Sequence, residues 1–184
     1  MSFFRAVSLS SIAAVLALSS NIAFANPDVG GAQMFENKNI IENAVNSKDH
    51  TTLVAAVKAA GLVETLSGPG PFTVFAPVNK AFDKLPKGTV DTLLKPENKA
   101  MLTAILTYHV VPGKHSAEEL MKAAKANGGK TMLTTVEGEK LTIIEKGSKL
   151  EVKDAKGDIG TITIADVNQS NGVIHVIDTV MLPK

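Results

Sequence analysis

The chain of 184 residues contains 19 Lys and Arg, 18 Asp and Glu, and no Cys. A formal charge of +1 provides no strong attraction to a nucleic acid and no long-range attraction to an anionic membrane. The absence of Cys excludes disulfides and thiol catalysis, and the length suits a single domain with its own core.

Residues 1–25 have the pattern of a secretory signal peptide. Arg5 supplies the positive start, an apolar run covers residues 12–18, and Ala23-Phe24-Ala25 matches a small-x-small cleavage site. The apolar run is shorter than the roughly 20 residues that a membrane span needs, so an uncleaved anchor is the less favoured alternative. We expect export to the periplasm or the extracellular space, with no transmembrane segment in the product.

The next part of the chain changes from turn-rich to helical. Residues 26–36 begin with a stretch rich in Gly, Pro and Asp and are predicted to form a flexible lead-in. Apolar residues at helical spacing then predict a helix from Asn39 and a second one that runs from an N-cap at Asp49 to Gly61. After a rigid turn over residues 67–71, a short strand is predicted over residues 72–76.

Helices continue to about residue 126. Two short helical pieces are predicted in residues 79–94, and Pro96 opens a stronger helix because proline suits the first turn. Residues 108–113 leave this helix as an extended segment. Ser116 and Glu119 form a capping-box pattern that predicts one more helix.

Beyond residue 127 the apolar period changes to two, which predicts strands. These strands are expected at residues 131–136, 141–145, 150–153, 159–167 and 173–182. Short turns between them favour antiparallel pairing. Helices in the first half and strands in the second predict an α+β fold, as one domain over residues 37–184.

Motifs for catalysis or metal binding are weak. Gly129-Lys130-Thr131 resembles the end of a phosphate-binding loop, but Ala124 stands where that motif needs Gly. The four histidines show no metal-ligand spacing, and no Gly-x-Ser-x-Gly nucleophile elbow is present. We therefore expect no catalytic residues, no metal and no cofactor, and the chain is not expected to be an enzyme.

Three segments resemble the fasciclin domain family. They are GPFTVFAPVNKAF at residues 70–82, LTYHVVPG at 106–113 and NGVIHVIDTVMLP at 171–183. Their order and separation agree with the family, and the similarity covers roughly residues 37–184, as in a bacterial secreted member. The resemblance implies a β-sandwich or wedge with helices packed along the sheets. It also implies a role in cell adhesion or in binding a surface or matrix protein or a glycan, without catalytic residues.

The first and last segments are expected to be structural before anything else. Alternation along residues 72–76 places Phe75 on the face opposite Val74, so this strand should be buried on both sides. Asn79 can cap the helical turn that follows it, and His175 should be a partly buried, hydrogen-bonded residue. A buried Asp178 should accept hydrogen bonds from the backbone or a hydroxyl. The residues of this structural signature are Phe72, Thr73, Phe75, Pro77, Asn79, Phe82, His175 and Asp178.

Tyr108 and His109 are the candidate partner-binding residues. The resemblance carries a receptor-binding role to this pair, whereas elementary packing suggests that Tyr108, the only tyrosine, anchors its hydroxyl in the core. Two functions remain open: an interaction module, expected as a monomer, and a carrier of a small apolar ligand between helices and sheet.

Overall fold

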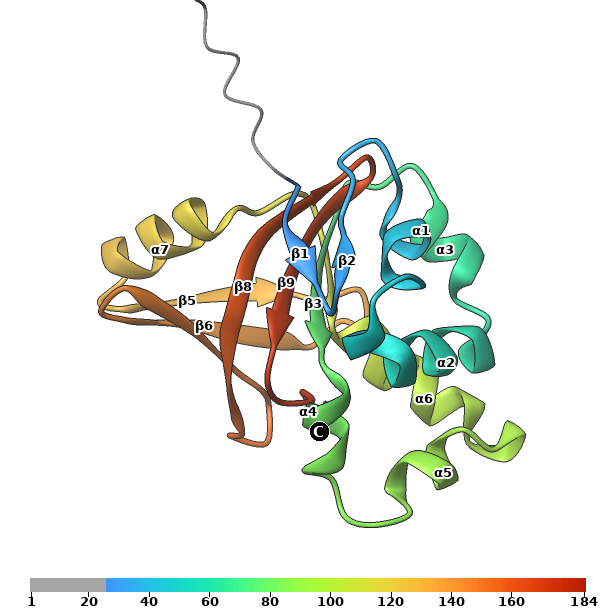
Figure 1. The fold of residues 1–184 in the computed structure, drawn as a ribbon. Coiled ribbons are helices and arrows are strands. Elements are labelled where there is room, and N and C mark those ends of the chain that lie inside the picture. The colour runs from blue at the N-terminus through green and yellow to red at the C-terminus, as the bar shows by residue number, and fades with distance from the viewer. Residues whose placement is uncertain (1–25) are drawn as a thin grey trace, which may run out of the picture.

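The structure is a computed structural model that describes residues 26–184, so the predicted signal peptide lies outside the described residues. Its central element is a seven-stranded sheet with the strand order β4-β3-β9-β8-β7-β6-β5 (Figure 1). The strands of this sheet are β3 (Phe72–Pro77), β4 (Val110–Pro112), β5 (Lys130–Thr134), β6 (Lys140–Lys146), β7 (Lys149–Lys153), β8 (Ile159–Gln169) and β9 (Gly172–Ile177).

Seven α-helices and two 3-10 helices form within residues 26–184. They are α1 (Ile40–Ala44), η1 (Lys48–His50), α2 (Thr51–Ala60), α3 (Val63–Ser67), α4 (Asn79–Asp83), α5 (Thr89–Leu93), η2 (Pro96–Asn98), α6 (Lys99–Tyr108) and α7 (Ala117–Ala126). Helices α1, α2, α3, α5 and α6 gather on one side of the sheet, and α7 lies at the opposite end of the molecule (Figure 1). This segregation confirms the α+β class.

The sheet curls until its two edges almost meet. Neighbouring strands are antiparallel, except that β3 and β9 run parallel in a register from Phe72 opposite Gly172 to Pro77 opposite Ile177. Just beyond β5, the Val136 amide donates to the Val110 carbonyl of β4 over 2.8 Å. The curl gives the sheet an inner and an outer face, each of which needs apolar side chains.

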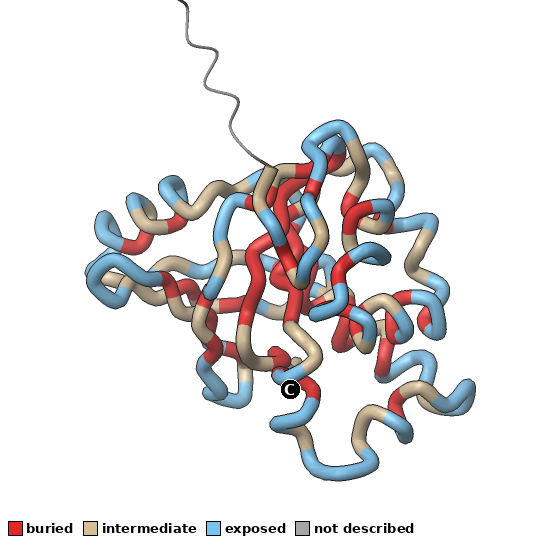
Figure 2. Tube along the Cα trace, in the orientation of Figure 1, coloured by how far each residue is buried: buried red, intermediate tan, exposed pale blue. Residues whose placement is uncertain are grey.

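Two apolar cores therefore lie on either side of the central strands, where Figure 2 shows the buried residues concentrated. The first packs the helices α1 to α6 against the sheet and includes Val74 and Ala76. The second lies within the curled strands and against α7, and it includes Phe75 and Leu120. The predicted burial of β3 on both faces is thus confirmed, because a side chain every second residue points to the same face.

The expected flexible lead-in is folded instead. Strands β1 (Asp28–Val29) and β2 (Ala32–Gln33) form a small hairpin. Val29 and Met34 are only 3% and 2% exposed and belong to the first core. Burial of these two apolar side chains stabilises the folded arrangement. The turn-rich composition reflects only the tight turn between the two strands of the hairpin.

Local helix signals were right at some ends and wrong at others. Ser116 forms the predicted capping box with Glu119, and Gly61 ends α2 in the left-handed conformation at φ 73°. Asp49 does not cap α2, because η1 precedes that helix. Within residues 26–184, no helix has the length and apolar character that crossing a membrane requires.

Candidate functional site

Tyr108 closes α6 and is completely buried. Its hydroxyl donates to the Lys140 carbonyl over 3.0 Å and accepts from the Ala155 amide over 2.9 Å. Burial raises the pKa of Tyr108 to about 12, because the interior disfavours a phenolate. The hydroxyl therefore stays neutral and ties α6 to β6 and to the turn after β7.

His109 follows directly and is 3% exposed. The Met181 amide donates to its Nε2 over 3.0 Å, and Nδ1 lies 2.8 Å from the Ile105 carbonyl oxygen. Because an amide can only donate, Nε2 carries no proton, and Nδ1 must carry the proton that it donates to Ile105. Burial lowers the pKa of His109 to about 4, so the ring is neutral at pH 7 with both nitrogens engaged.

These contacts support the packing alternative for the pair. Neither side chain presents a free polar atom at the surface, and both fasten α6 to distant segments. A contribution of Tyr108 and His109 to partner binding stays a prediction. On this geometry it would act through the placement of α6 and β4, because the side chains themselves lie inside.

A second set of polar contacts surrounds His175, which is completely buried in β9. Its Nε2 lies 2.8 Å from the His115 carbonyl oxygen, and its Nδ1 accepts from the Asp166 amide over 3.2 Å. The Thr73 hydroxyl, also buried, donates to the Gly113 carbonyl over 2.7 Å and accepts from the His115 amide over 2.9 Å. Burial also lowers the pKa of His175. The two side chains together fix the loop that leads into α7.

Asp166 completes this arrangement and was not singled out from the sequence. It is the one residue other than Gly with a positive φ, 56°, within residues 26–184. This conformation, at an irregularity of β8, directs its Oδ1 to the Ala117 amide at 2.7 Å, where α7 begins. The sequence feature that could have revealed this irregularity is the spacing of three residues between Ile164 and Val167. This spacing interrupts the two-residue alternation of a strand.

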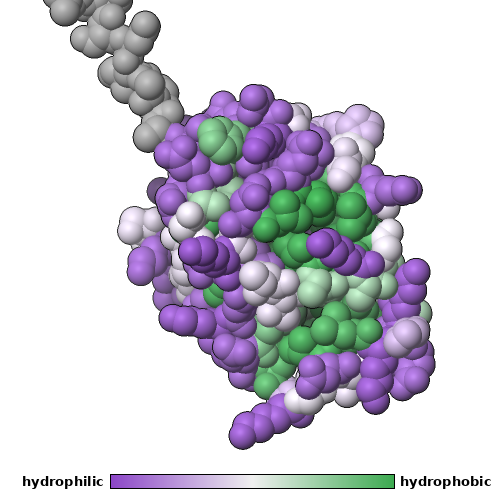
Figure 3. Space-filling view, turned by 45° about the vertical axis from the view of Figure 1, so that its right-hand side comes forward, coloured by the Kyte–Doolittle hydropathy of each residue, from purple (hydrophilic) through white to green (hydrophobic). Residues whose placement is uncertain are grey.

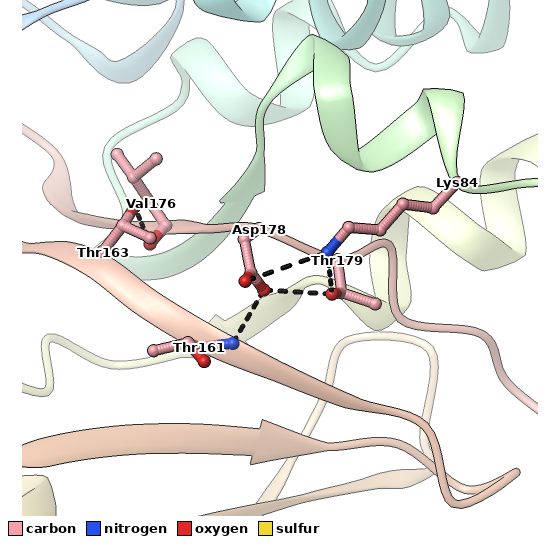
Figure 4. A network of polar contacts seen from close by, with 6 residues as sticks. All are labelled: Lys84, Thr161, Thr163, Val176, Asp178 and Thr179. Atoms are coloured by element: carbon pink, nitrogen blue, oxygen red, sulfur yellow. Dashed lines mark hydrogen bonds and ion pairs between the residues drawn. The ribbon is translucent and has the colours of Figure 1, made fainter.

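Asp178 makes the kind of contacts predicted for it (Figure 4), but its side chain is not buried. Its Oδ1 accepts from the Thr161 amide over 2.8 Å and from the Thr179 hydroxyl over 3.0 Å. Its Oδ2 lies 3.8 Å from the Lys84 amine, and the Asp178 side chain is 41% exposed. The carboxylate therefore joins β8 to the segment after β9 at the surface.

Asn79 acts as a cap, although for another helix than the one expected. Its Oδ1 accepts from the Thr52 amide over 3.0 Å and from the Thr51 hydroxyl over 3.2 Å, at the start of α2. Its Nδ2 donates to the Lys48 carbonyl over 2.8 Å. The remaining signature residues pack: Phe82 and Phe72 against the first core, and Pro77 beside Ile177.

An apolar cavity of about 40 Å³ lies between α1, α2, α3, α6 and the sheet. A second cavity of about 30 Å³ shares Ile40, Ala44, Leu53 and Val74 with it. Seen from the helical side, the surface around these helices carries large apolar areas (Figure 3). Within residues 26–184, no three His, Asp or Glu side chains gather as metal ligands.

Comparison with known proteins agrees with this geometry. The sequence model of the fasciclin domain family matches residues 48–183 of this chain. The chain belongs to the fasciclin domain family.

Its relatives include bacterial proteins, and a solved insect structure shares its fold. Protein sll1483 of Synechocystis is 54% identical over 144 residues, which are 78% of this chain and 73% of that protein. Cell surface glycolipoprotein MPB83 of Mycobacterium bovis is 36% identical over 76% of this chain and 58% of its own length. The structure of a FAS1 domain pair from the insect cell adhesion molecule fasciclin I matches with a TM-score of 0.70 at 20% identity. That match covers 79% of this chain and 51% of the insect chain.

In this fasciclin domain the first and last signature segments lie side by side, on the parallel strands β3 and β9. Two glycines permit the approach. A Cβ at Gly172 would collide with the Phe72 carbonyl, and one at Gly70, which has φ 58°, would collide with the Asn171 carbonyl. The Asn171 side chain adds bonds to α1 and to the end of α3, through the Ile40 amide and the Leu66 carbonyl.

Proposed function

We propose that this fasciclin domain is an exported binding module. Its partner is a surface or matrix protein or a glycan, in the periplasm or the extracellular space. Support comes from the family, from the solved neighbour described as an insect cell adhesion molecule and from the relative described as a cell surface glycolipoprotein. The predicted signal peptide at residues 1–25 agrees with this location.

The observation that carries the proposal is the apolar helical face (Figure 3). Its helices and their flanks leave apolar side chains half-buried or exposed, among them Ile41, Val45, Val54, Val63 and Leu94. Large exposed apolar areas edged by polar residues are typical of interaction sites. The helical face therefore suits partner binding better than the internal Tyr108–His109 pair does.

We infer a binding role rather than a catalytic one. General acid–base catalysis needs a titratable group within reach of a substrate. Both ring nitrogens of His109 and of His175 are held by backbone groups, and so is the hydroxyl of Tyr108. These three side chains hold the fold together, and none of them offers a free base.

The test uses immobilised protein of residues 26–184 and quantitative mass spectrometry of what it retains from envelope and extracellular fractions. Val63→Lys places a charge on the helical face, and Ile159→Lys places the same charge on β8, where Ile159 is 49% exposed. A specific partner should be lost with Val63→Lys and kept with Ile159→Lys. Equal retention by both variants contradicts the proposed surface.

The cavity between helices and sheet favours a carrier of a small apolar ligand as the second candidate. The cavity is lined almost entirely by apolar side chains, but its volume of about 40 Å³ is well below the roughly 300–1,000 Å³ of ordinary ligand pockets, so a carrier would need this space to open on binding. Native mass spectrometry of protein purified from its own host tests this function. A co-purifying apolar molecule supports the carrier, and ligand-free protein counts against it.

A further inference from the structure

A surface hollow of about 340 Å³ lies between α4, the start of β8 and the segment that follows β9. Its volume falls in the roughly 300–1,000 Å³ range of ligand pockets, unlike the cavities of about 40 and 30 Å³ beneath the helices. It shares no lining residue with either of them. Its apolar lining is buried or half-buried and consists of Ala81, Leu85, Val180 and Leu182.

One buried carboxylate fixes two sides of this hollow. Asp154 is 5% exposed and lies in the turn before β8. Its Oδ1 accepts from the amides of Gly157 and Asp158, each over 2.8 Å, and its Oδ2 accepts from the Leu182 amide over 2.9 Å. The backbone on both sides of the hollow is therefore held in place before a ligand arrives, and such preorganisation lowers the cost of binding.

Two of the residues that line the hollow, Lys84 and Asp158, carry a formal charge. The Lys84 amine lies 3.8 Å from Oδ2 of Asp178 and donates to the Thr179 hydroxyl over 3.1 Å (Figure 4). The exposed Asp158 carboxylate takes part in neither of the two ion pairs found within residues 26–184. Because Asp178 compensates the charge of Lys84, the charge that remains at the hollow is the negative one of Asp158.

We propose that this hollow binds a small primary alkylammonium, whose charged group pairs with Asp158 and whose short aliphatic chain lies along the apolar lining. A carboxylate of the same size would be repelled by Asp158 and would compete with Asp178 for Lys84. An alcohol would keep the apolar contacts and lose the ion pair. The hollow is a second site, separate from the helical face that is proposed to bind the partner.

Three probes of equal chain length test the headgroup: pentylamine, pentanol and pentanoate. Each is titrated at pH 7 into protein of residues 26–184, and binding is followed by the amide chemical shifts of residues 157–160 and 179–182. Pentylamine should bind more tightly than the other two probes, because it alone combines the ion pair with the apolar contacts.

Asp158→Asn removes the charge and keeps the size of the side chain. Its control is Asp91→Asn, at another exposed aspartate, in the first turn of α5. Pentylamine should bind about two- to fivefold more weakly to Asp158→Asn, which corresponds to the contribution of up to about 1 kcal/mol from an exposed ion pair. Its affinity for Asp91→Asn, and the affinity of pentanol for both variants, should stay within about twofold of wild type by the same reasoning.

A second variant places a cation in the hollow. Ile159 lines it and is 49% exposed, so Ile159→Lys should weaken pentylamine binding at least about fivefold through charge repulsion. Val63→Lys, on the helical face, should leave this binding unchanged. Retention of the proposed partner should respond to the same two variants in the opposite way, so failure of either proposal is recognised independently of the other. Thermal unfolding verifies the fold of each variant.

Three results would overturn the inference. The first is equal affinity for pentylamine and pentanol, or an unchanged pentylamine affinity in Asp158→Asn. The second is the absence of shifts in residues 157–160 and 179–182 with every probe. The third concerns the source of the ammonium: Nα-acetyl-lysine N-methylamide carries the same group on a peptide backbone. Tighter binding of this compound than of pentylamine would assign the hollow to a lysine side chain of a polypeptide instead of a free amine.

Discussion

Acidification should destabilise this domain through His109. The free ring has a pKa of 6.5, and burial lowers the pKa of His109 in the fold to about 4. Between these values the unfolded chain binds a proton that the folded chain excludes, so unfolding is favoured as the pH falls. The stabilising contribution is complete above pH 6.5, declines below it and is lost by about pH 4.

The size of this effect follows from the same pKa values. At about 1.4 kcal/mol per pK unit, the difference between 6.5 and about 4 corresponds to about 3 kcal/mol. The structural reason is specific. A proton on Nε2 would face the Met181 amide, which is itself a donor, and that bond would be replaced by a repulsive contact.

Urea unfolding of wild type and His109→Gln at pH 7.5, 6, 5 and 4 measures the contribution. The variant should be less stable at pH 7.5, and its deficit should shrink by about 3 kcal/mol toward pH 4. His50 and His175, whose pKa values burial also lowers, are present in both proteins and cancel in the difference. A deficit that stays constant from pH 7.5 to pH 4 would refute the reasoning.

Four substitutions at three residues test other contacts by the same urea assay. Tyr108→Phe should cost about 1–3 kcal/mol because the Ala155 amide loses its buried acceptor; a cost near zero would show that water replaces the hydroxyl. Asn79→Ala should cost about 1 kcal/mol by uncapping α2, and an unchanged midpoint would contradict that role. Asp166→Ala should cost about 2 kcal/mol through the lost acceptor for Ala117 and the strained φ. Asp166→Asn should cost less, since Asn tolerates that φ; equal losses would count against the explanation.

The features that were predicted correctly from the sequence depend on residues that lie close together in the chain. Ser116 and Glu119 lie three residues apart and cap α7 reciprocally, and the alternation around Phe75 placed it correctly. Asn79 shows the limit of this reasoning. Its preference for a helix start was evident, but the start that it caps belongs to α2, about thirty residues earlier in the chain, and only the folded arrangement brings them together.

Non-local packing also explains the other differences. The composition of residues 26–36 describes the hairpin turn, whereas the burial of Val29 and Met34 depends on helices and strands formed much later in the chain. Asp178 stands in an apolar strand pattern, yet it lies just past the end of β9, where solvent reaches it. The apolar cavity between the helices and the sheet had no sequence signal, because its lining comes from separate helices and strands.

The pairing of β3 with β9 decides where function can reside. This parallel pair contributes to both cores, because Val74 and Ile174 belong to the first core and Phe75 and Ile177 to the second. Phe75 and His175 lie opposite each other with ring centroids 5.6 Å apart. A change there disturbs both cores, as well as the loop that His175 and Thr73 hold before α7. The helices α1, α2 and α3 meet the sheet on one face only and leave apolar side chains at the surface. A substitution such as Val63→Lys therefore tests the proposed binding surface while the central strands stay intact.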